Sequence, residues 1–419
     1  MAERSPSKPP LEYSILYTAT LCLLALGAVM VYSASSAESL LDGTGDPSRF
    51  LKRYLVLGGV GLVAMHVVSR LGTGVVRSLT PVALLGSFVL TAAVLVPGVG
   101  VSVNGATRWL GAGPLQFQPS ELLKVSLVLY AAQLLAARPN GLRTLGGLCK
   151  PLLLVVATAC ALLLAQPDMG TAIVVCLSIG ALLLAAGARL RDLATIAGVL
   201  SLLAFVVAVV EPYRRERLTS FLDPWADAGD TGFQAVQAMI AMGSGGVFGV
   251  GLGESVQKVF YLPEAHTDMI LAIIGEEVGL VGVTGLVALY GMIAYGGLRA
   301  AKLARDRYAK LLAAGITSLI LCQATLNLFA VMGLAPLTGV PLPFISFGNS
   351  NLIVLLAGMG LVLNVASGGR AGAAGAIAGH GARLRAIAGG TAGGADSDRR
   401  RRDGRARGAG ARDRRRAAG

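Results

Sequence analysis

The residues best suited to chemistry lie in one short segment, residues 261–268. It brings Glu264, His266 and Asp268 together directly before a long apolar run. An ionisable side chain at the edge of a membrane-spanning segment is costly to keep there, and such side chains usually have a function. We therefore take Asp268 as the first candidate functional residue, with Glu264 and His266 beside it.

Basic and aromatic residues in neighbouring predicted loops could bind a polyanion. Arg presents paired donors that match phosphate oxygens, whereas Lys provides a mobile point charge. Arg108, Arg214 and Lys258 are therefore candidates for phosphate binding. Gln257 lies next to Lys258 as a supporting residue, and Trp109 suits an apolar lipid tail. An alternative for both Arg214 and Trp109 is that they anchor a helix end at the membrane interface.

Two charged residues fall inside a predicted helix that starts at Pro119. Glu121 and Lys124 are three positions apart and therefore share one face of this helix. A buried charge without a partner would be strongly destabilising. An ion pair that stabilises the bundle is one interpretation, and a direct catalytic role is the other.

Other acidic residues allow a structural and a functional interpretation. Asp168 lies between two apolar runs, where it can cap the following helix or support the site. Glu276 and Glu277 lie more than two helical turns beyond Asp268. They can line a proton or ion path, or they can pair with Lys or Arg on another helix.

The predicted loop at residues 335–347 contains several prolines and no charged residue. Its hydroxyl and amide groups, including the hydroxyl of Ser346, could bind a sugar. Ser350 is more simply explained as the cap of the helix that begins there.

The elements that must position these residues are membrane-spanning helices. Of the 419 residues, 54% are hydrophobic and only 14% are charged, and the mean hydropathy is +0.68. This composition excludes an ordinary soluble globular domain. The apolar runs are continuous rather than alternating, which predicts an all-α polytopic membrane protein and not a β-barrel.

Ten apolar runs approach the length needed to span the hydrocarbon core, which takes about 20 helical residues. The fifth and sixth are short and close together, so they can also be interpreted as one hairpin that does not fully cross the membrane. The predicted spans are residues 13–33, 53–71, 79–97, 119–137, 149–166, 171–188, 192–210, 268–298, 309–333 and 350–366.

Lys and Arg accumulate in cytoplasmic loops of membrane proteins. Here they are concentrated in every second loop, which predicts that both termini are cytoplasmic. The long loop at residues 211–267, between the seventh and eighth spans, is then extracytoplasmic, and Asp268 faces outward. Its glycine-rich stretch, residues 242–253, also contains Val, Phe and Leu. We therefore expect it to fold back onto the bundle as a re-entrant or interfacial structure rather than form a flexible linker.

We divide the chain into a cytoplasmic N-terminal segment (residues 1–12), a membrane domain (residues 13–366) and a cytoplasmic tail (residues 367–419). The tail is rich in Gly, Ala and Arg, carries most of the net charge of +13, and has too little apolar surface to fold. It either stays solvated or contacts anionic lipid or an acidic partner.

The cysteines and histidines show no metal-ligand spacing, which argues against a structural zinc or haem site. The first span lacks a small-residue cleavage site, so we expect no cleavable signal. We also expect no nucleic-acid partner.

Several sequence blocks together resemble the SEDS family (shape, elongation, division and sporulation) of membrane peptidoglycan glycosyltransferases. The resemblance covers residues 13–366, and residues 251–268 resemble the cell-division members more than the elongation members. The blocks are Gly-Ala-Thr-Arg-Trp at 105–109, Phe-Gln-Pro-Ser-Glu at 117–121, Gln-Pro-Asp-Met-Gly at 166–170, His-Thr-Asp at 266–268 and Pro-Leu-Pro-Phe-Ile-Ser at 341–346.

The resemblance implies that the chain polymerises lipid II into glycan strands, and Asp268 matches the essential aspartate of the family. This carboxylate would act as the general base that takes the proton of the acceptor sugar's 4-hydroxyl group. The lipid pyrophosphate leaves as a stable anion, so it needs cations rather than a carboxylic acid. Arg108, Lys258 or a divalent metal such as Mg or Mn would supply them. We therefore predict inversion at the donor sugar.

The resemblance also implies a class B penicillin-binding protein, a transpeptidase, as partner. Other partners would be the nascent glycan strand, membrane lipids and further membrane proteins of the division machinery. The implied location is the bacterial cell (inner) membrane at the division septum, and an elongation or sporulation role is the alternative. One departure is Phe-Gly-Asn-Ser-Asn at 347–351, where members usually carry Tyr-Gly-Gly-Ser-Ser. Asn tolerates positive φ better than most residues, so the turn can survive.

Two other classes of protein are possible. A lipid II flippase or other transporter also needs polar residues inside a bundle, but it would show paired broken helices and access from both faces. The charged motifs gather on one face and no internal repeat is visible, which favours the enzyme. A non-catalytic scaffold for a transpeptidase would tolerate Asp268→Asn.

Overall fold

The computed structural model describes residues 9–41, 45–103, 106–111, 116–138, 149–210, 220–259 and 261–368. The chain divides into two units, Met1–Gly368 and Gly369–Gly419, and the second lies outside the described residues. The Arg-rich part of the predicted tail therefore lies outside them as well.

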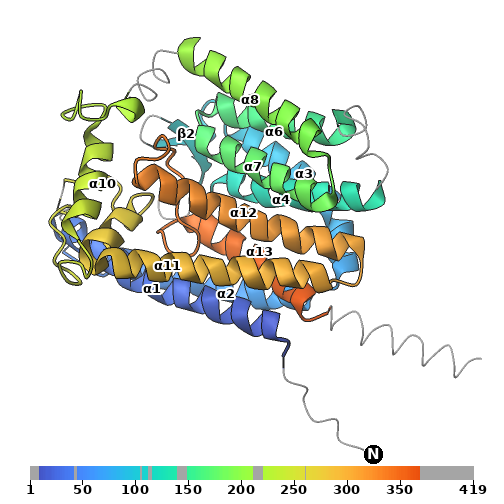
Figure 1. The fold of residues 1–419 in the computed structure, drawn as a ribbon, viewed down its shortest axis with the longest axis horizontal. Helices are drawn as coiled ribbons and strands as arrows, with labels where there is room; N and C mark the ends of the chain where they lie inside the picture. Colours follow the sequence, from blue (N-terminus) through green and yellow to red (C-terminus); the bar gives the residue numbers. More distant parts are fainter. Residues whose placement is uncertain are drawn as a thin grey trace, which may run out of the picture. The chain divides into compact units, whose positions relative to one another are not determined.

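The described residues are mainly helical, as predicted (Figure 1). Eight of their helices are long and apolar enough to cross a membrane. The shorter α6, preceded by the π-helix η2, and the helix α8 occupy the positions of the fifth and seventh predicted spans. The helices are α1 (Leu11–Leu41), α2 (Arg49–Arg70), α3 (Thr73–Ala93), α4 (Pro119–Ala137), η2 (Cys149–Leu153), α6 (Leu154–Ala165), α7 (Met169–Ala186), α8 (Leu190–Val210), α10 (Phe233–Ser244), α11 (Ile270–Leu303), α12 (Arg307–Val331) and α13 (Asn349–Ala366).

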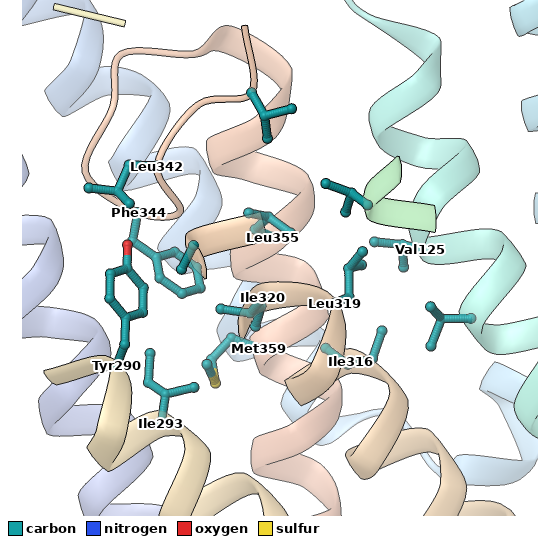
Figure 2. Close-up of a cluster of buried hydrophobic side chains, with 14 of the residues drawn as sticks. Val125, Tyr290, Ile293, Ile316, Leu319, Ile320, Leu342, Phe344, Leu355 and Met359 are labelled. Atoms are coloured by element: carbon teal, nitrogen blue, oxygen red, sulfur yellow. The ribbon is translucent and has the colours of Figure 1, made fainter. Parts of the chain in front are cut away.

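The centre of the bundle is formed by α12 and α13. Helix α12 packs against α4, α7, α11 and α13, while α13 lies along α2 and α1 lies along α11. Figure 2 shows the apolar contact between the two central helices, where Ile320 of α12 lies close to Leu355 and Met359 of α13. Most residues of both helices are buried, which explains why their sequences are apolar on nearly every face.

An irregular segment, residues 332–348, returns between α12 and α13, and its middle part is buried. Buried carbonyl groups outside a helix need donors from elsewhere. Side chains of three helices supply them. The bonds are Asn327 Nδ2 to Val340 O (2.9 Å), Gln323 Nε2 to Pro341 O (2.9 Å), Tyr290 Oη to Pro343 O (2.6 Å) and Tyr54 Oη to Phe344 O (2.6 Å).

Helix α11 is interrupted at Gly279, which has φ 70° and ψ −163°. The glycine-rich stretch predicted to fold back does so at this break. Its backbone donates to α11 from Val250 N to Glu276 O (2.9 Å) and from Gly251 N to Glu277 O (3.1 Å), and it accepts at Gly246 O from Leu280 N (3.0 Å) and at Val247 O from Val281 N (3.1 Å). The break therefore leaves these backbone groups paired.

Two local predictions need correction. The strands β1 (Gly100–Val103) and β2 (Ala106–Leu110) form a small antiparallel sheet in a region that the sequence predicted as a loop, because strands this short leave little periodic signal. Helix α13 is capped by Gly348, not by Ser350. The Ser350 hydroxyl instead accepts a hydrogen bond from the backbone of Gln118 (2.8 Å), and so attaches α13 to the start of α4.

Candidate active site

Asp268 lies in the turn directly before α11 and is partly exposed. Its carboxylate accepts a hydrogen bond from Thr267 Oγ1 (3.2 Å) and lies over Gly339, where an added Cβ would be 3.8 Å from Asp268 Oδ2. The residues around it line a shallow hollow that contains no cavity large enough for a water molecule. The partly exposed carboxylate is therefore reached from the surface and not through an enclosed pocket.

The backbone of Asp268 is held by Asn327 of α12, a residue that the sequence analysis did not identify. Asn327 Nδ2 donates to Asp268 O (2.7 Å) as well as to Val340 O (2.9 Å), and its side chain is buried. One carboxamide thus joins the turn at Asp268 to the irregular segment of residues 332–348, here called the proline-rich segment. The available signal was the pair of carboxamides, Gln323 and Asn327, four positions apart in an otherwise apolar helix.

Glu264 and His266 lie in different environments. Glu264 is exposed, has φ 57°, and accepts at Oε2 from Thr267 Oγ1 (2.7 Å). His266 is buried, with Nδ1 3.2 Å from Glu38 Oε2 of α1 and its ring 4.4 Å from that of Phe50. His266 thus attaches the aspartate segment to α1, while Glu264 remains at the surface.

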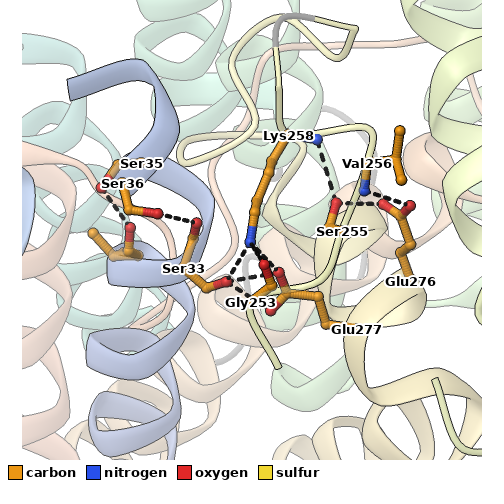
Figure 3. A network of polar contacts seen from close by, with 10 residues as sticks. Ser33, Ser35, Ser36, Gly253, Ser255, Val256, Lys258, Glu276 and Glu277 are labelled. Atoms are coloured by element: carbon orange, nitrogen blue, oxygen red, sulfur yellow. Dashed lines mark hydrogen bonds and ion pairs between the residues drawn. The ribbon is translucent and has the colours of Figure 1, made fainter. Parts of the chain in front are cut away.

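Lys258 has a different environment from the phosphate site that we predicted. Its ammonium group is buried and forms an ion pair with Glu277 Oε1 (2.8 Å). It also donates to Gly253 O (2.6 Å) and Ser33 Oγ (3.2 Å), as Figure 3 shows. The phosphate-binding role of Lys258 stays a prediction, and the ion pair with Glu277 is a contact that the sequence analysis did not assign to this residue.

The same network supplies partners for both glutamates of α11. Ser33 Oγ donates to Glu277 at 2.6 and 2.7 Å. Glu276 accepts from Val256 N (3.1 Å) and from the Ser255 hydroxyl. For Glu277 the structure contains the pairing with a cation, although the cation lies in the loop and not on another helix. Glu276 is held by neutral donors of the same loop.

Glu121 and Lys124 form a buried ion pair at 3.0 Å in α4. Lys124 Nζ also donates to Gln323 Oε1 (2.8 Å), and Gln323 Nε2 donates to Asn351 Oδ1 (3.1 Å). Asn351 is one of the positions at which the chain departs from the family pattern. This line of polar contacts connects α4 through α12 to α13, beneath the proline-rich segment.

Arg108 holds the turn between α6 and α7. Its guanidinium donates to Gln166 O (3.2 Å) and to Pro167 O. In the same turn Asp168 caps α7, accepting at Oδ1 from Thr171 N (3.3 Å). Gly170, two residues after Asp168, packs closely on Thr338 O. Thr338 belongs to the segment that lines the Asp268 hollow. Arg108 is therefore connected to the Asp268 region through the turn that it holds and the proline-rich segment on which Gly170 packs.

The remaining predicted residues take up several environments. Trp109 lies in β2 opposite Val101. The Ser346 hydroxyl is buried and accepts from Leu342 N (2.8 Å), which closes a turn of the proline-rich segment. Gln257 Oε1 is buried and has no hydrogen-bond partner among the described residues. Arg214 lies outside the described residues.

A larger cleft, with a cavity volume of about 90 Å³, lies between α10 with the preceding loop and the C-terminal end of α12. It shares Ala330 and Leu337 with the hollow at Asp268. Its described polar side chains are neutral: Ser220, Thr231 and Gln234. Gln234 Nε2 also donates to Pro263 O (3.3 Å), which ties the wall of the cleft to the aspartate segment.

Within the described ranges, no three His, Cys, Asp or Glu side chains gather as a metal site. A divalent cation prefers several oxygen ligands, and Asp268 supplies one carboxylate. A cation bound beside Asp268 would thus take its other oxygens from a substrate phosphate or from water.

The family model that describes FtsW, RodA and SpoVE, named "Cell cycle protein", matches residues 14–370. The chain belongs to this family. It is 38% identical over 355 residues to stage V sporulation protein E of Bacillus subtilis, covering 84% of this chain and 96% of the relative. It is 43% identical over 355 residues to the probable peptidoglycan glycosyltransferase FtsW of Thioalkalivibrio sulfidiphilus, covering 84% of this chain and 88% of the relative.

Two solved structures resemble this SEDS-family chain over most of its length. One comes from work described as structural coordination of polymerization and crosslinking by a peptidoglycan synthase complex, with a TM-score of 0.69 and 34% identity. It covers 84% of this chain and 96% of that one. The other is the rod shape determining protein RodA of Thermus thermophilus, with a TM-score of 0.60, 31% identity, and coverage of 84% and 95%.

Proposed function

We propose that this chain is a peptidoglycan glycosyltransferase that polymerises lipid II into glycan strands, with Asp268 as the general base. The observation that carries the proposal is a partly exposed carboxylate at the end of a membrane-spanning helix, held by Asn327 beside a hollow and a neutral cleft. Relatives named as FtsW peptidoglycan glycosyltransferases support the enzyme over a flippase or a scaffold.

In the proposed step, Asp268 takes the proton from the 4-hydroxyl group of the acceptor sugar. The hydroxyl oxygen then forms a bond to the anomeric carbon of the donor sugar. The bond from that carbon to the lipid pyrophosphate breaks, and the pyrophosphate leaves with the electron pair. Attack from the side opposite the leaving group inverts the configuration at the anomeric carbon.

The neutral cleft suits the sugar part of a substrate, because hydroxyl and carboxamide groups hydrogen-bond to sugar hydroxyls without requiring a charge. The pyrophosphate needs cationic donors instead. Arg108 is the candidate for this role among the described residues, since the turn that it holds packs on the segment lining the Asp268 hollow. Lys258 is less suited, because its ammonium group is already paired with Glu277.

We further propose that the site lies on the extracytoplasmic face of the bacterial cell membrane, at the division septum, and that a class B penicillin-binding protein is the partner. The alternation of Lys and Arg between loops supports the orientation. A similar solved structure is described in terms of polymerization and crosslinking in one complex, which supports a crosslinking partner.

The test is formation of glycan strands from labelled lipid II by the purified protein with its cognate penicillin-binding partner. Asp268→Asn should lower the rate by about 10²–10⁴-fold, the usual contribution of a general base. Asp230→Asn, which alters an exposed carboxylate of the long loop, should leave the rate unchanged. Equal rates for wild type and Asp268→Asn would refute the general-base role, and no polymer from wild type would favour a transporter or a scaffold.

A further inference from the structure

The first two turns of α11 are buried, although the helix is long and apolar enough to span a membrane. Its residues 270–277 are all buried, and exposed apolar side chains begin only at Leu280 (60%) and Val281 (53%) and continue with Val287 (49%). The covering element is the loop of residues 245–259, here called the cover loop, whose backbone is hydrogen-bonded to residues 276–281. Where the cover loop lies on α11, the loop therefore forms part of the outer surface of the bundle.

The depth of the cover loop follows from its pairing with α11. The opposite end of α11 carries Arg299 and Lys302. A membrane crossing takes about 20 helical residues, so a crossing counted from Leu298 ends near Gly279. Residues 276–281, and the cover loop with them, thus lie at the boundary between the hydrocarbon core and the headgroups.

The two faces of the cover loop differ in polarity. The inner face carries Lys258, which pairs with the buried Glu277. The outer face carries Phe248 (82% exposed), Leu252 (63%) and Val256 (63%), with one exposed charge, Glu254. Apolar side chains on one face and a buried ion pair on the other are typical of a segment that lies in the membrane interface.

We propose that the cover loop inserts into the lipid bilayer, with Phe248 and Leu252 among the acyl chains and Glu254 at the headgroups, and that it shields the Lys258–Glu277 pair from lipid. The occupant of this surface is lipid and not protein, because the apolar surface continues directly into the exposed stripe of α11 at Leu280. An ion pair facing acyl chains without such a cover would be strongly disfavoured.

Fluorescence of a single tryptophan tests this placement. In a background with Trp109→Phe and Trp225→Phe, Phe248→Trp is compared with Gly229→Trp, both in nanodiscs that contain lipids brominated near the headgroup end of the acyl chain. Gly229 is the control because it is exposed, an added Cβ there meets no atom within 4 Å, and Asp227 and Asp230 flank it. We expect bromolipid quenching at least about twofold stronger for Phe248→Trp, and iodide quenching stronger for Gly229→Trp.

Equal iodide quenching at the two positions would overturn the proposal. So would bromolipid quenching that is lost when the penicillin-binding partner is added, because the surface would then be a protein interface. If Phe248→Trp does not purify as a folded protein, Leu252→Trp replaces it with the same expected result. The readout is fluorescence, so its outcome is independent of whether the chain is a glycosyltransferase.

Discussion

At the scale of single residues, the structure holds Asp268 by its peptide group as well as by a contact to its carboxylate. Asn327 fixes the backbone carbonyl, while the carboxylate stays at the edge of the hollow. A base whose backbone is fixed in this way keeps its position, and precise placement is a large part of catalytic rate.

Replacing Asn327 by Leu removes the donor to two backbone carbonyls while keeping a similar volume. We expect the maximal rate of glycan formation to fall by about 10-fold or more, with a smaller change in the apparent KM, because the base is displaced. The control is Asn364→Leu, since Asn364 also bonds two carbonyls, Ser69 O (2.7 Å) and Leu71 O (2.8 Å), away from the site. Equal loss of rate in both variants, measured per folded molecule, would show that Asn327 is only structural.

The Lys258–Glu277 pair gives a second prediction. Lys258→Met leaves a buried carboxylate without its cation and should destabilise the fold by about 3–5 kcal/mol, whereas Lys258→Met with Glu277→Leu should cost less. Lys52→Met, which breaks the exposed pair with Asp46, should leave the thermal midpoint nearly unchanged. A Lys258→Met protein of normal stability but low polymerase activity would support the pyrophosphate-binding role.

At the scale of elements, the contact between the cover loop and α11 depends on glycine. Gly249 has φ 80° and lies against the carbonyl of Glu277, so an added Cβ would overlap that oxygen. Gly253 has φ 87°, but an added Cβ there would meet nothing within 4 Å. Both glycines thus have a positive φ, but only Gly249 lies close to the backbone of α11.

Gly249→Ala should therefore lower the stability of the protein more than Gly253→Ala. We expect about 1–3 kcal/mol from overpacking in addition to the strain that both alanines share. Thermal unfolding of the two variants in the same detergent measures the difference. Identical midpoints would mean that the cover loop can move away from α11 at little cost.

At the scale of the whole molecule, the orientation in the membrane decides which substrates can reach Asp268. With the native cysteines replaced by alanine, Gly229→Cys should react with a membrane-impermeant maleimide in intact spheroplasts. Arg305→Cys, at the other end of the bundle in the turn between α11 and α12, should react only after permeabilisation. The opposite pattern would place Asp268 on the cytoplasmic face and contradict the proposed function.

The sequence by itself determined that the chain is a helical membrane protein and where each span approximately lies. The thickness and apolarity of the bilayer fix the length and hydropathy of a spanning helix, and both are local properties of the sequence. The sequence also suggested the pairing of Glu121 with Lys124, since residues three apart on a helix are neighbours. The site at the Asp268 segment stays a prediction.

Only the tertiary structure decided which polar groups meet across the bundle. Ser33 and Glu277 are separated by 244 positions, and Asn327 reaches Asp268 from another helix. Neither contact has a local periodicity that a sequence pattern could reveal. The partner of Lys258 was not predicted for the same reason. Its charge suggested a ligand-binding role, which stays a prediction, and only the fold shows that the buried ammonium group is paired with Glu277.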